Sequence, residues 1–321
     1  MRILTLVLAL LLFAVPAQSQ QVWTPNKPIK LIVTYAPGGS ADVLARLMQG
    51  PMSKALGVPI IIENRAGGGG NIGSLAVVRA DPDGTTIGIG AASTHAINPT
   101  LFGAKLPFRV PQDFTPIGQI LSQPNVLLVS LDTPVHTPAE FVAWMKAHPG
   151  TSFGTAGVGS TNHLTGELIN QRYGIQMTHT PYKSGGQALN DLMGGHVKIV
   201  VDNITTAAPL AKNGQARAIA VSTLKRAAIL PDTPTFDESG APGFDLSSWQ
   251  GLFGPPGLPA PVLQRLHPAM LAALDDLIVK TRLVEFGSEP VGSSPDEFLT
   301  YINGELKKWG DLVKTSGATV D

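Results

Sequence analysis

The sequence predicts an α/β fold built from two lobes. Short apolar runs alternate with segments of helical periodicity, an order that is typical of parallel sheets. The alternation occurs twice, in residues 29–92 and again in residues 151–223, and a long apolar stretch separates the two regions. A Gly-rich loop follows the first strand in each region, where open parallel sheets bind ligands. We therefore expect two α/β lobes, joined by two hinge crossings, around a ligand cleft.

The first region shows the pattern of a parallel sheet most clearly. Apolar runs at 29–36, 58–65 and 85–92 predict three strands, and the segments at 41–56 and 71–80 between them have helical spacing. This strand-helix-strand order implies parallel strands with right-handed crossovers. The carboxyl ends of the three strands then lie together at one edge of the sheet.

The second region repeats this architecture without a fixed sequence repeat. A long apolar run at 117–130 predicts a strand that passes between the lobes. Thr137, followed by Pro138 and Glu140, predicts a capped helix start. The strands of the second lobe are expected at 151–157, 176–183, 197–203 and 217–223, and its helices at 137–150, 164–173, 187–193 and 205–213.

The last part of the chain shows no further alternation. The segment at 244–256 predicts a strand that crosses back to the first lobe, and a helix at 259–274 follows, which Pro268 would bend. Ser294 and Pro295 predict the start of a closing helix. The core face of that helix is expected to consist of Phe298, Tyr301, Ile302, Leu306, Trp309 and Val313.

The first residues differ from the rest of the chain. Arg2 precedes an apolar run that ends at Val15, and the small residues Ala17 and Ser19 suit a signal peptidase site. The run is shorter than the ~20 residues of a membrane-spanning helix. We expect a cleavable signal peptide and export to the periplasm. The predicted divisions are 1–19 for the signal peptide, 20–122 plus 247–321 for lobe 1, and 123–246 for lobe 2.

The composition argues against several classes of function. The chain of 321 residues has 23 basic and 23 acidic side chains, and the net charge of zero argues against binding of DNA or RNA. The absence of cysteine excludes thiol catalysis and thiolate metal sites, and the seven histidines lack the spacing of a zinc site. The sequence has no P-loop and no hydrolase nucleophile motif. We expect no metal and no catalytic residue.

A glycine run resembles a dinucleotide-binding motif in its spacing alone. Gly68, Gly70 and Gly73 match G-x-G-x-x-G, but they follow the second strand instead of the first. The next strand also lacks the acidic residue that binds the ribose. We interpret the run as a loop at the mouth of the cleft, with Asn71 capping the next helix, and expect no cofactor.

Two Gly-rich loops predict an anion-binding site. PGGS at 37–40 follows the first strand, with Ser40 as the expected N-cap, and GVGSTNH at 157–163 takes the same place in the second lobe. Each loop places the free N–H groups of a helix start at the end of a strand. If the lobes face each other, both helix starts converge on one small acidic molecule. The alternative is that both loops are ordinary tight turns.

Three side chains near these loops are candidates for ligand contact. His95 and His163 fall in predicted cleft loops and can donate to a carboxylate, and Asp202 ends a strand on the same side. The alternatives are exposed loop histidines and an acid that binds a water, an amine or a neighbouring loop. Trp249 and Phe253 on the returning strand are expected to pack in the core or hinge.

The chain resembles the Bug-type receptors of the tripartite tricarboxylate transporter (TTT) family over nearly all of its mature length. The resemblance rests on the order and spacing of YAPGGSADVLAR, ENRAGGGGNIG, DPDGTTIGIG, GVGSTNHLTGEL, PYKSGGQALNDLMGGHV and WQGLFGPPGLPAPVLQRL. It implies a type II periplasmic-binding-protein fold. It also implies a monomeric receptor, not an enzyme, that delivers a small carboxylate to a membrane permease. Ligands of the family include dicarboxylates, tricarboxylates, acidic amino acids and aromatic acids.

The resemblance places the first carboxylate-binding loop at Tyr35 to Ser40 and its partner loop at Gly157 to Thr161, with His163 beside it. A sensor subunit for a membrane kinase and an exported enzyme acting on a carboxylate remain alternatives. The residues expected to bind the ligand are Tyr35, Ala36, Pro37, Gly38, Gly39, Ser40, Asn71, Thr94, His95, Gly157, Ser160, Thr161, His163, Tyr182 and Asp202.

Overall fold

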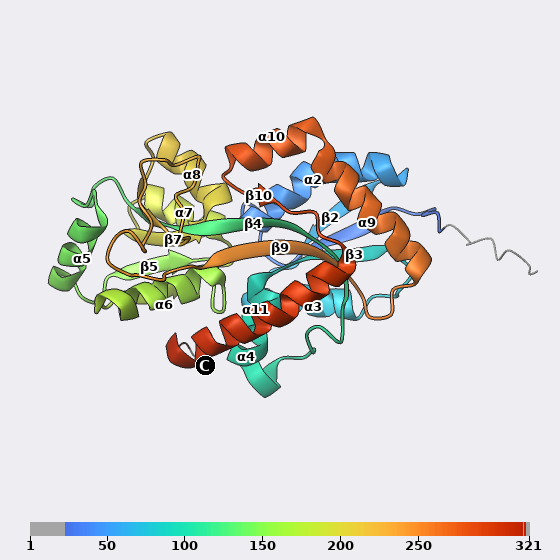
Figure 1. Cartoon of the computed structure of the whole chain (residues 1–321), viewed down its shortest axis with the longest axis horizontal. Helices are drawn as coiled ribbons and strands as arrows, with labels where there is room; N and C mark the ends of the chain where they lie inside the picture. Colours follow the sequence, from blue (N-terminus) through green and yellow to red (C-terminus); the bar gives the residue numbers. More distant parts are fainter. Residues whose placement is uncertain (1–22, 317, 319–321) are drawn as a thin grey trace, which may run out of the picture.

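Figure 1 shows the computed structural model, which describes residues 23–316 and residue 318. The expected signal peptide lies outside the described residues. Two α/β lobes lie side by side, and the strands β4 (Thr115–Val129) and β9 (Ser247–Gly254) run from one lobe to the other. The predicted fold class is confirmed: the protein has two α/β lobes and two hinge crossings. Within the described residues, no helix combines the length and apolar composition needed to cross a membrane.

Lobe 1 is built on three parallel strands. β1 (Ile29–Val33) lies between β2 (Ile60–Asn64) and β3 (Thr86–Ala91) and pairs in parallel with both. β9 extends this sheet as an antiparallel neighbour of β3. The helical segments that follow these strands are α2 (Ser40–Leu56), η1 (Gly68–Gly70), α3 (Asn71–Val78), the π-helical turn η2 (Ser93–Ile97), α4 (Asn98–Phe102) and η3 (Gly103–Lys105).

Lobe 2 has the same alternation. β5 (Ser152–Thr155) pairs in parallel with β6 (Thr178–Pro181) and with β7 (Ile199–Asn203). The predicted helix cap is confirmed, because the Thr137 hydroxyl accepts a hydrogen bond from the Glu140 N–H. The remaining elements are α5 (Pro138–Ala147), α6 (Thr161–Tyr173), α7 (Gly185–Met193), α8 (Ile204–Lys212) and β8 (Arg217–Val221).

Strand β4 belongs to both lobes. Its first part, residues 115–124, pairs with β9 of lobe 1, and its second part, residues 125–129, pairs with β7 and β8 of lobe 2. The short strand β10 (Glu289–Pro290) pairs with the first part of β4. One continuous strand therefore carries backbone hydrogen bonds from lobe 1 into lobe 2, and β4 and β9 form the hinge.

Three helices follow the hinge: α9 (Ala260–Asp275), α10 (Leu277–Glu285) and α11 (Pro295–Ser316). The sequence predicted two helices here and missed α10. Pro268 lies inside α9 without ending it. Asp276 is the N-cap of α10, and its carboxyl group accepts hydrogen bonds from two backbone N–H groups of that helix. Val279 and Leu283 of α10 are buried, but its apolar residues Leu277, Ile278 and Val284 are exposed, so the periodic signal by which helices are found is weak.

Two predicted helix caps differ from the structure by one residue. The N-cap positions of α2 and α3 are Gly39 and Gly70, and neither helix has a side-chain cap. Ser40 and Asn71 are instead the first residues inside their helices. Their side chains are therefore available for longer-range contacts. Ser40 uses its hydroxyl at the interface between the lobes, as described below.

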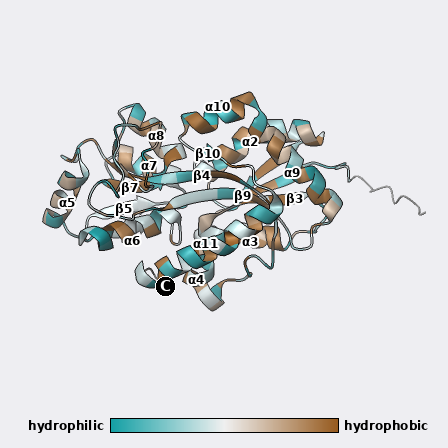
Figure 2. Cartoon of the chain, in the orientation of Figure 1, coloured by the Kyte–Doolittle hydropathy of each residue, from teal (hydrophilic) through white to brown (hydrophobic). Residues whose placement is uncertain are grey.

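Helix α11 fixes the hinge from one side. Figure 2 shows hydrophilic residues on its outer face, while Phe298, Ile302 and Trp309 are buried, as the sequence predicted. Glu305 is also buried, and its carboxyl group accepts the indole N–H of Trp249 at 2.9 Å and that of Trp309 at 2.7 Å. Since Trp249 lies on β9, this pair of hydrogen bonds connects α11 to a hinge strand.

The variant Glu305→Ala should lower the free energy of unfolding by about 3 kcal/mol, because two buried indole donors lose their acceptor. Urea denaturation followed by tryptophan fluorescence measures this change. The matched control is Lys308→Ala, which removes an exposed partner 3.9 Å from Glu305 and should change the stability by less than about 0.5 kcal/mol. Equal effects of the two variants would contradict the prediction.

Candidate functional site

A small polar cavity lies between the two lobes. Its volume is about 30 Å³, which leaves room for a water molecule or two. Lobe 1, lobe 2 and β9 all contribute to its wall, so it closes only when the lobes meet. The polar residues of the wall are Tyr35, Gly39, Ser40 and Ser93 of lobe 1, Ser160, Thr161, Asn162, Ser184, Gly185, Asp202 and Asn203 of lobe 2, and Ser248 and Gln250 of β9.

In the described chain, four α-helices begin at this cavity. Ser40, Thr161 and Gly185 are the first residues of α2, α6 and α7, and Asn203 precedes α8. The first turn of each helix has free N–H groups and the positive end of the helix dipole. No Lys, Arg or His is among the described lining residues. Among the described lining residues, positive partial charge therefore comes from backbone N–H groups and helix dipoles, which are suited to bind an anion.

Ser40 connects both lobes and the hinge at the cavity. Its Oγ accepts hydrogen bonds from Asn203 Nδ2 at 2.7 Å and from Gln250 Nε2 at 2.9 Å. The Ser40 hydroxyl hydrogen is then free to donate to a ligand. Gln250 Oε1 is buried and has no hydrogen-bond partner within residues 23–316. The wall thus offers a ligand one hydrogen-bond donor, the Ser40 hydroxyl, and one unpaired acceptor, Gln250 Oε1.

Asp202 is the acidic group of the cavity wall. It is buried beside Gly185 of α7 and accepts a hydrogen bond from the Thr206 hydroxyl at 2.6 Å. Burial raises the pKa of this carboxyl group to about 6, and the bonds from Thr206 and the Asn203 backbone oppose the increase only in part. Near neutral pH the group therefore titrates more readily than an exposed aspartate would.

Glycines allow the lobes to approach each other beside the cavity and at its mouth, the adjoining pocket lined by Tyr35, Gly67 to Gly70, Phe102, Ala156 to Val158 and Pro181 to Lys183. A Cβ atom on Gly186 would lie 2.4 Å from the Gly38 carbonyl oxygen, and one on Gly69 would lie 2.6 Å from that of Val158. The Ala36 N–H also donates to the Lys183 carbonyl at 3.3 Å across the interface. Backbone therefore meets backbone here, and any side chain at these glycines would hold the lobes apart.

Eight of the predicted residues line the cavity or its mouth. Tyr35, Gly39, Ser40, Ser160, Thr161 and Asp202 line the cavity, and Gly157 and Tyr182 line the mouth. Tyr35 lies at both, with its hydroxyl 2.6 Å from Ser93 Oγ, and burial raises its pKa to about 12. Ala36, Pro37 and Gly38 lie at the interlobe contacts instead.

The four remaining predicted residues, Asn71, Thr94 and His95 of lobe 1 and His163 of lobe 2, lie neither at the cavity or its mouth nor at these interlobe contacts. His95 is buried in lobe 1, where its ring stacks on Phe253 with centroids 3.9 Å apart, and burial lowers its pKa to about 3. Thr94 is buried beside it and bonds to the His95 ring at 2.7 Å. Asn71 accepts a hydrogen bond from Asn98. These three side chains support the loops of lobe 1, and Ser93 of the same turn faces the cavity.

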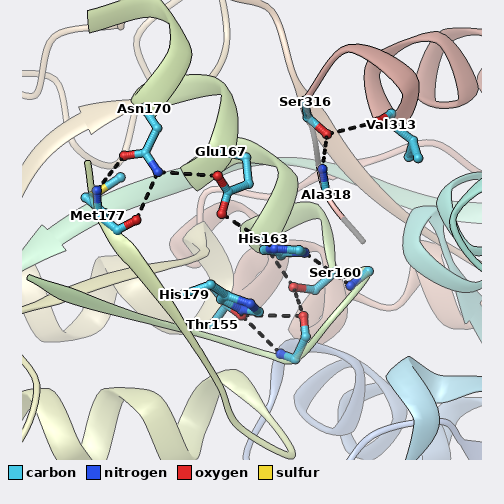
Figure 3. A network of polar contacts seen from close by, with 12 residues as sticks. Thr155, Ser160, His163, Glu167, Asn170, Met177, His179, Val313, Ser316 and Ala318 are labelled. Carbon is cyan, nitrogen blue, oxygen red and sulfur yellow. Dashed lines mark hydrogen bonds and ion pairs between the residues drawn. The ribbon is translucent and has the colours of Figure 1, made fainter. Parts of the chain in front are cut away.

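His163 is not among the residues that line the cavity. In Figure 3 it lies beside Ser160 and His179. Its ring stacks on His179 with centroids 3.8 Å apart, and its Nδ1 accepts from the Gly159 N–H. Ser160 accepts from the His163 N–H and donates to the Gly157 carbonyl. Burial and the neighbouring His163 lower the pKa of His179 to about 3. The stacked pair therefore positions the loop whose residues line the cavity.

The sequence analysis did not identify Asn203, Ser248 and Gln250 as residues that line the cavity. Asn203 directly follows the candidate Asp202, and its side chain crosses to Ser40. Ser248 and Gln250 flank Trp249, which is fully buried in the core as expected. Because side chains alternate along a strand, a core Trp249 places its two neighbours on the opposite face. That alternation was the signal that could have identified them.

Comparison with known proteins identifies the family. Residues 44–318 match the Tripartite tricarboxylate transporter family receptor (TctC), and the chain belongs to this family. BugT of Bordetella pertussis is 31% identical over 295 residues, which cover 92% of this chain and 90% of BugT.

Two solved structures of Rhodopseudomonas palustris proteins are also similar. MatC with bound malate is 34% identical, with a TM-score of 0.86 over 90% of this chain and 99% of MatC. Rpa4515 with adipate is 33% identical, with a TM-score of 0.88 over 92% of this chain and 99% of Rpa4515. The expected family and the type II periplasmic-binding-protein fold are thus confirmed.

The variant Asp202→Asn should stabilise the protein at neutral pH and change little in acid. The pKa is about 3.8 when exposed and about 6 when buried, so the folded protein loses stability as pH rises from about 4 to 6. The variant lacks this loss, and its free energy of unfolding should exceed that of the wild type by up to about 3 kcal/mol at pH 7. Urea denaturation at pH 7 and at about pH 4 measures the difference in free energy of unfolding between variant and wild type. A difference that does not depend on pH would contradict the prediction.

Proposed function

We propose that the protein is a periplasmic receptor that captures a small carboxylate between its lobes and delivers it to a TTT membrane permease. The observation that supports this most strongly is the convergence of four helix starts on a polar cavity without a cationic side chain among its described lining residues. Backbone N–H groups and hydroxyls are suitable donors for a carboxylate. The malate and adipate of two relatives at 34% and 33% identity agree with this class of ligand.

Binding requires the lobes to move. A cavity of about 30 Å³ is smaller than a four-carbon dicarboxylate, so the ligand enters when the lobes separate on the β4 and β9 hinge. Closure around the ligand would then bring the α7 start back toward Gly38, with the ligand in the space where Asn203 now bonds to Ser40. In this scheme the ligand shifts an equilibrium between open and closed conformers.

We further infer that the site binds its ligand without transforming it. Tyr35 and Asp202 are the titratable groups among the described lining residues, and burial keeps the Tyr35 phenol protonated. The wall hydroxyls of Ser40, Ser93 and Ser160 have no basic side chain beside them in the cavity. A nucleophile with its base, which an acyl-transfer enzyme requires, is not assembled in the described site.

Purified residues 20–321 should be screened by thermal shift against mono-, di- and tricarboxylates, acidic amino acids and aromatic acids. A ligand at ~100 times its dissociation constant adds about 2.7 kcal/mol of stability. Calorimetric titration and mass spectrometry of each hit then separate saturable binding from turnover. A chemically altered ligand would contradict the receptor function, and so would a protein that, after unfolding, dialysis and refolding, responds to none of the carboxylates.

The variant Gly186→Ala should weaken binding of the carboxylate found in this screen by about tenfold or more, which is about 1.4 kcal/mol. The added methyl group would meet the Gly38 carbonyl only when the lobes close. The matched control is Gly50→Ala in α2, where a Cβ meets nothing within 4 Å. Calorimetric titration should show near wild-type affinity for the control, and equal affinities of the two variants would contradict the closure scheme.

The absence of native cysteine allows a direct measurement of closure. Cysteines introduced at the exposed residues Lys54 of lobe 1 and Lys146 of lobe 2 can carry spin labels. The distance between the labels should shorten when the ligand binds to the wild-type background and shorten less in Gly186→Ala. A distance that the ligand leaves unchanged would rule out lobe closure as the response to binding.

A further inference from the structure

A second pocket lies at the hinge, away from the carboxylate site. Its volume is about 560 Å³, within the range of sites that hold small organic molecules. Its walls come from β4 at 122–124, the loop at 223–229 after β8, the start of β9, and the segment at 284–290 around β10. It shares no residue with the interlobe cavity or its mouth. In Figure 1 the surrounding elements lie between α8 and α10.

The side-chain amide of Gln123, at the hinge pocket, has an unsatisfied hydrogen-bond donor. Gln123 lines it and is 1% exposed, and its Oε1 accepts from the hydroxyls of Thr205 and Ser288. Gln123 Nε2 is buried and has no hydrogen-bond partner among the described residues. Since buried N–H groups are almost always paired, a rotation of this side chain toward the pocket would let the amide donate to a ligand there.

The remaining walls favour an uncharged, largely apolar ligand. Leu224 and Val284 contribute apolar side chains that are 50% and 63% exposed, and Pro124 and Ile229 also line the pocket. The charged residues of the lining balance in number: Lys225 and Arg226 are basic, Asp245 and Glu289 are acidic, and Arg226 is already paired with Glu238 at 2.9 Å. No excess of either sign selects an ion.

The two lobes meet directly at this pocket. Gly287 of lobe 1 is so close to Ile229 of lobe 2 that an added Cβ would lie 2.5 Å from its methyl group. The hydrogen bond between Thr205 of lobe 2 and Ser288 of lobe 1, at 2.7 Å, also crosses the interface. A rotation of the lobes on the hinge must therefore change the shape of the pocket. The shape seen here coexists with a closed interlobe cavity.

We infer that the hinge pocket is a second binding site, for a small neutral molecule with an apolar body and one carbonyl acceptor that bonds to the Gln123 amide. Because the pocket has this shape when the lobes are closed, its ligand stabilises the closed conformer. Occupancy of the hinge pocket then strengthens carboxylate binding, and the carboxylate strengthens binding at the hinge by the same factor. The coupling, but not the pocket itself, rests on the proposed function.

Acetanilide and N-butylacetamide are suitable probes, because each combines an apolar group with a neutral amide carbonyl. In the methyl NMR spectrum of the full mature chain, each probe should shift the signals of Leu224, Ile229 and Val284 saturably. The shifts should be lost in Val284→Asp and in Gln123→Leu. They should persist in Ile278→Asp, which places the same charge on α10 at a residue that is 69% exposed and outside the pocket.

Two results would overturn the site: no saturable shift with either probe, or shifts that persist in both Val284→Asp and Gln123→Leu. The use of two variants keeps the test valid if the buried substitution Gln123→Leu fails to fold, since Val284 is on the surface. Neither result depends on carboxylate binding, so a failure of the hinge site and a failure of the receptor function are distinguishable.

Calorimetric titration of the carboxylate with and without saturating acetanilide tests the coupling. The dissociation constant should fall by about threefold or more in the wild type and in Ile278→Asp, and remain unchanged in Val284→Asp. An unchanged dissociation constant in a protein whose methyl signals show a filled pocket would overturn the coupling. If acetanilide weakens carboxylate binding, the occupied pocket favours the open conformer. That result would also overturn the proposed coupling.

Discussion

The convergence of four helix starts between the lobes is the constraint on which the rest of the structure depends. Helices α2, α6 and α7 follow parallel strands, and α8 follows β7, so their N-termini gather at the carboxyl ends of both sheets. This arrangement supplies the cavity with positive helix ends, without lysine or arginine among its described lining residues. The proposed anion site is thus a consequence of topology, and side chains such as Ser40 only complete it.

Asp202 is an acidic residue buried in the cavity wall, and neighbouring groups partly compensate its charge. The start of α7 lies against its carboxyl group, and Thr206 donates to it, so the ionised form is partly compensated although burial raises the pKa to about 6. An acidic group beside an anion favours a ligand that also offers a donor, such as a hydroxyl or an ammonium group. Under the proposed function, Asp202 is therefore the lining side chain best placed to distinguish one carboxylate from another.

The hinge strand β9 contacts the core at α11, the interlobe cavity and the sheet of lobe 1. Trp249 packs in the core and bonds to Glu305 of α11, while Gln250 on the other face bonds to Ser40 in the cavity. The same strand pairs with β3 and β4 and so belongs to the sheet of lobe 1. Because alternate residues of one strand fix the core and the site, movement of the hinge and geometry of the cavity are physically linked.

The sequence by itself determined the alternation of strands and helices, the two crossings, and the glycine loops at 37–40 and 157–163, because periodicity, capping and positive φ angles are local properties. It did not determine which side chains of those loops face the cavity. His95 packs on Phe253 while Ser93, two residues away, lines the wall, and α10 was missed because three of its apolar residues, Leu277, Ile278 and Val284, are exposed. Only the tertiary structure decided these points, since the direction of a side chain at a strand end depends on neighbours that are distant in the sequence.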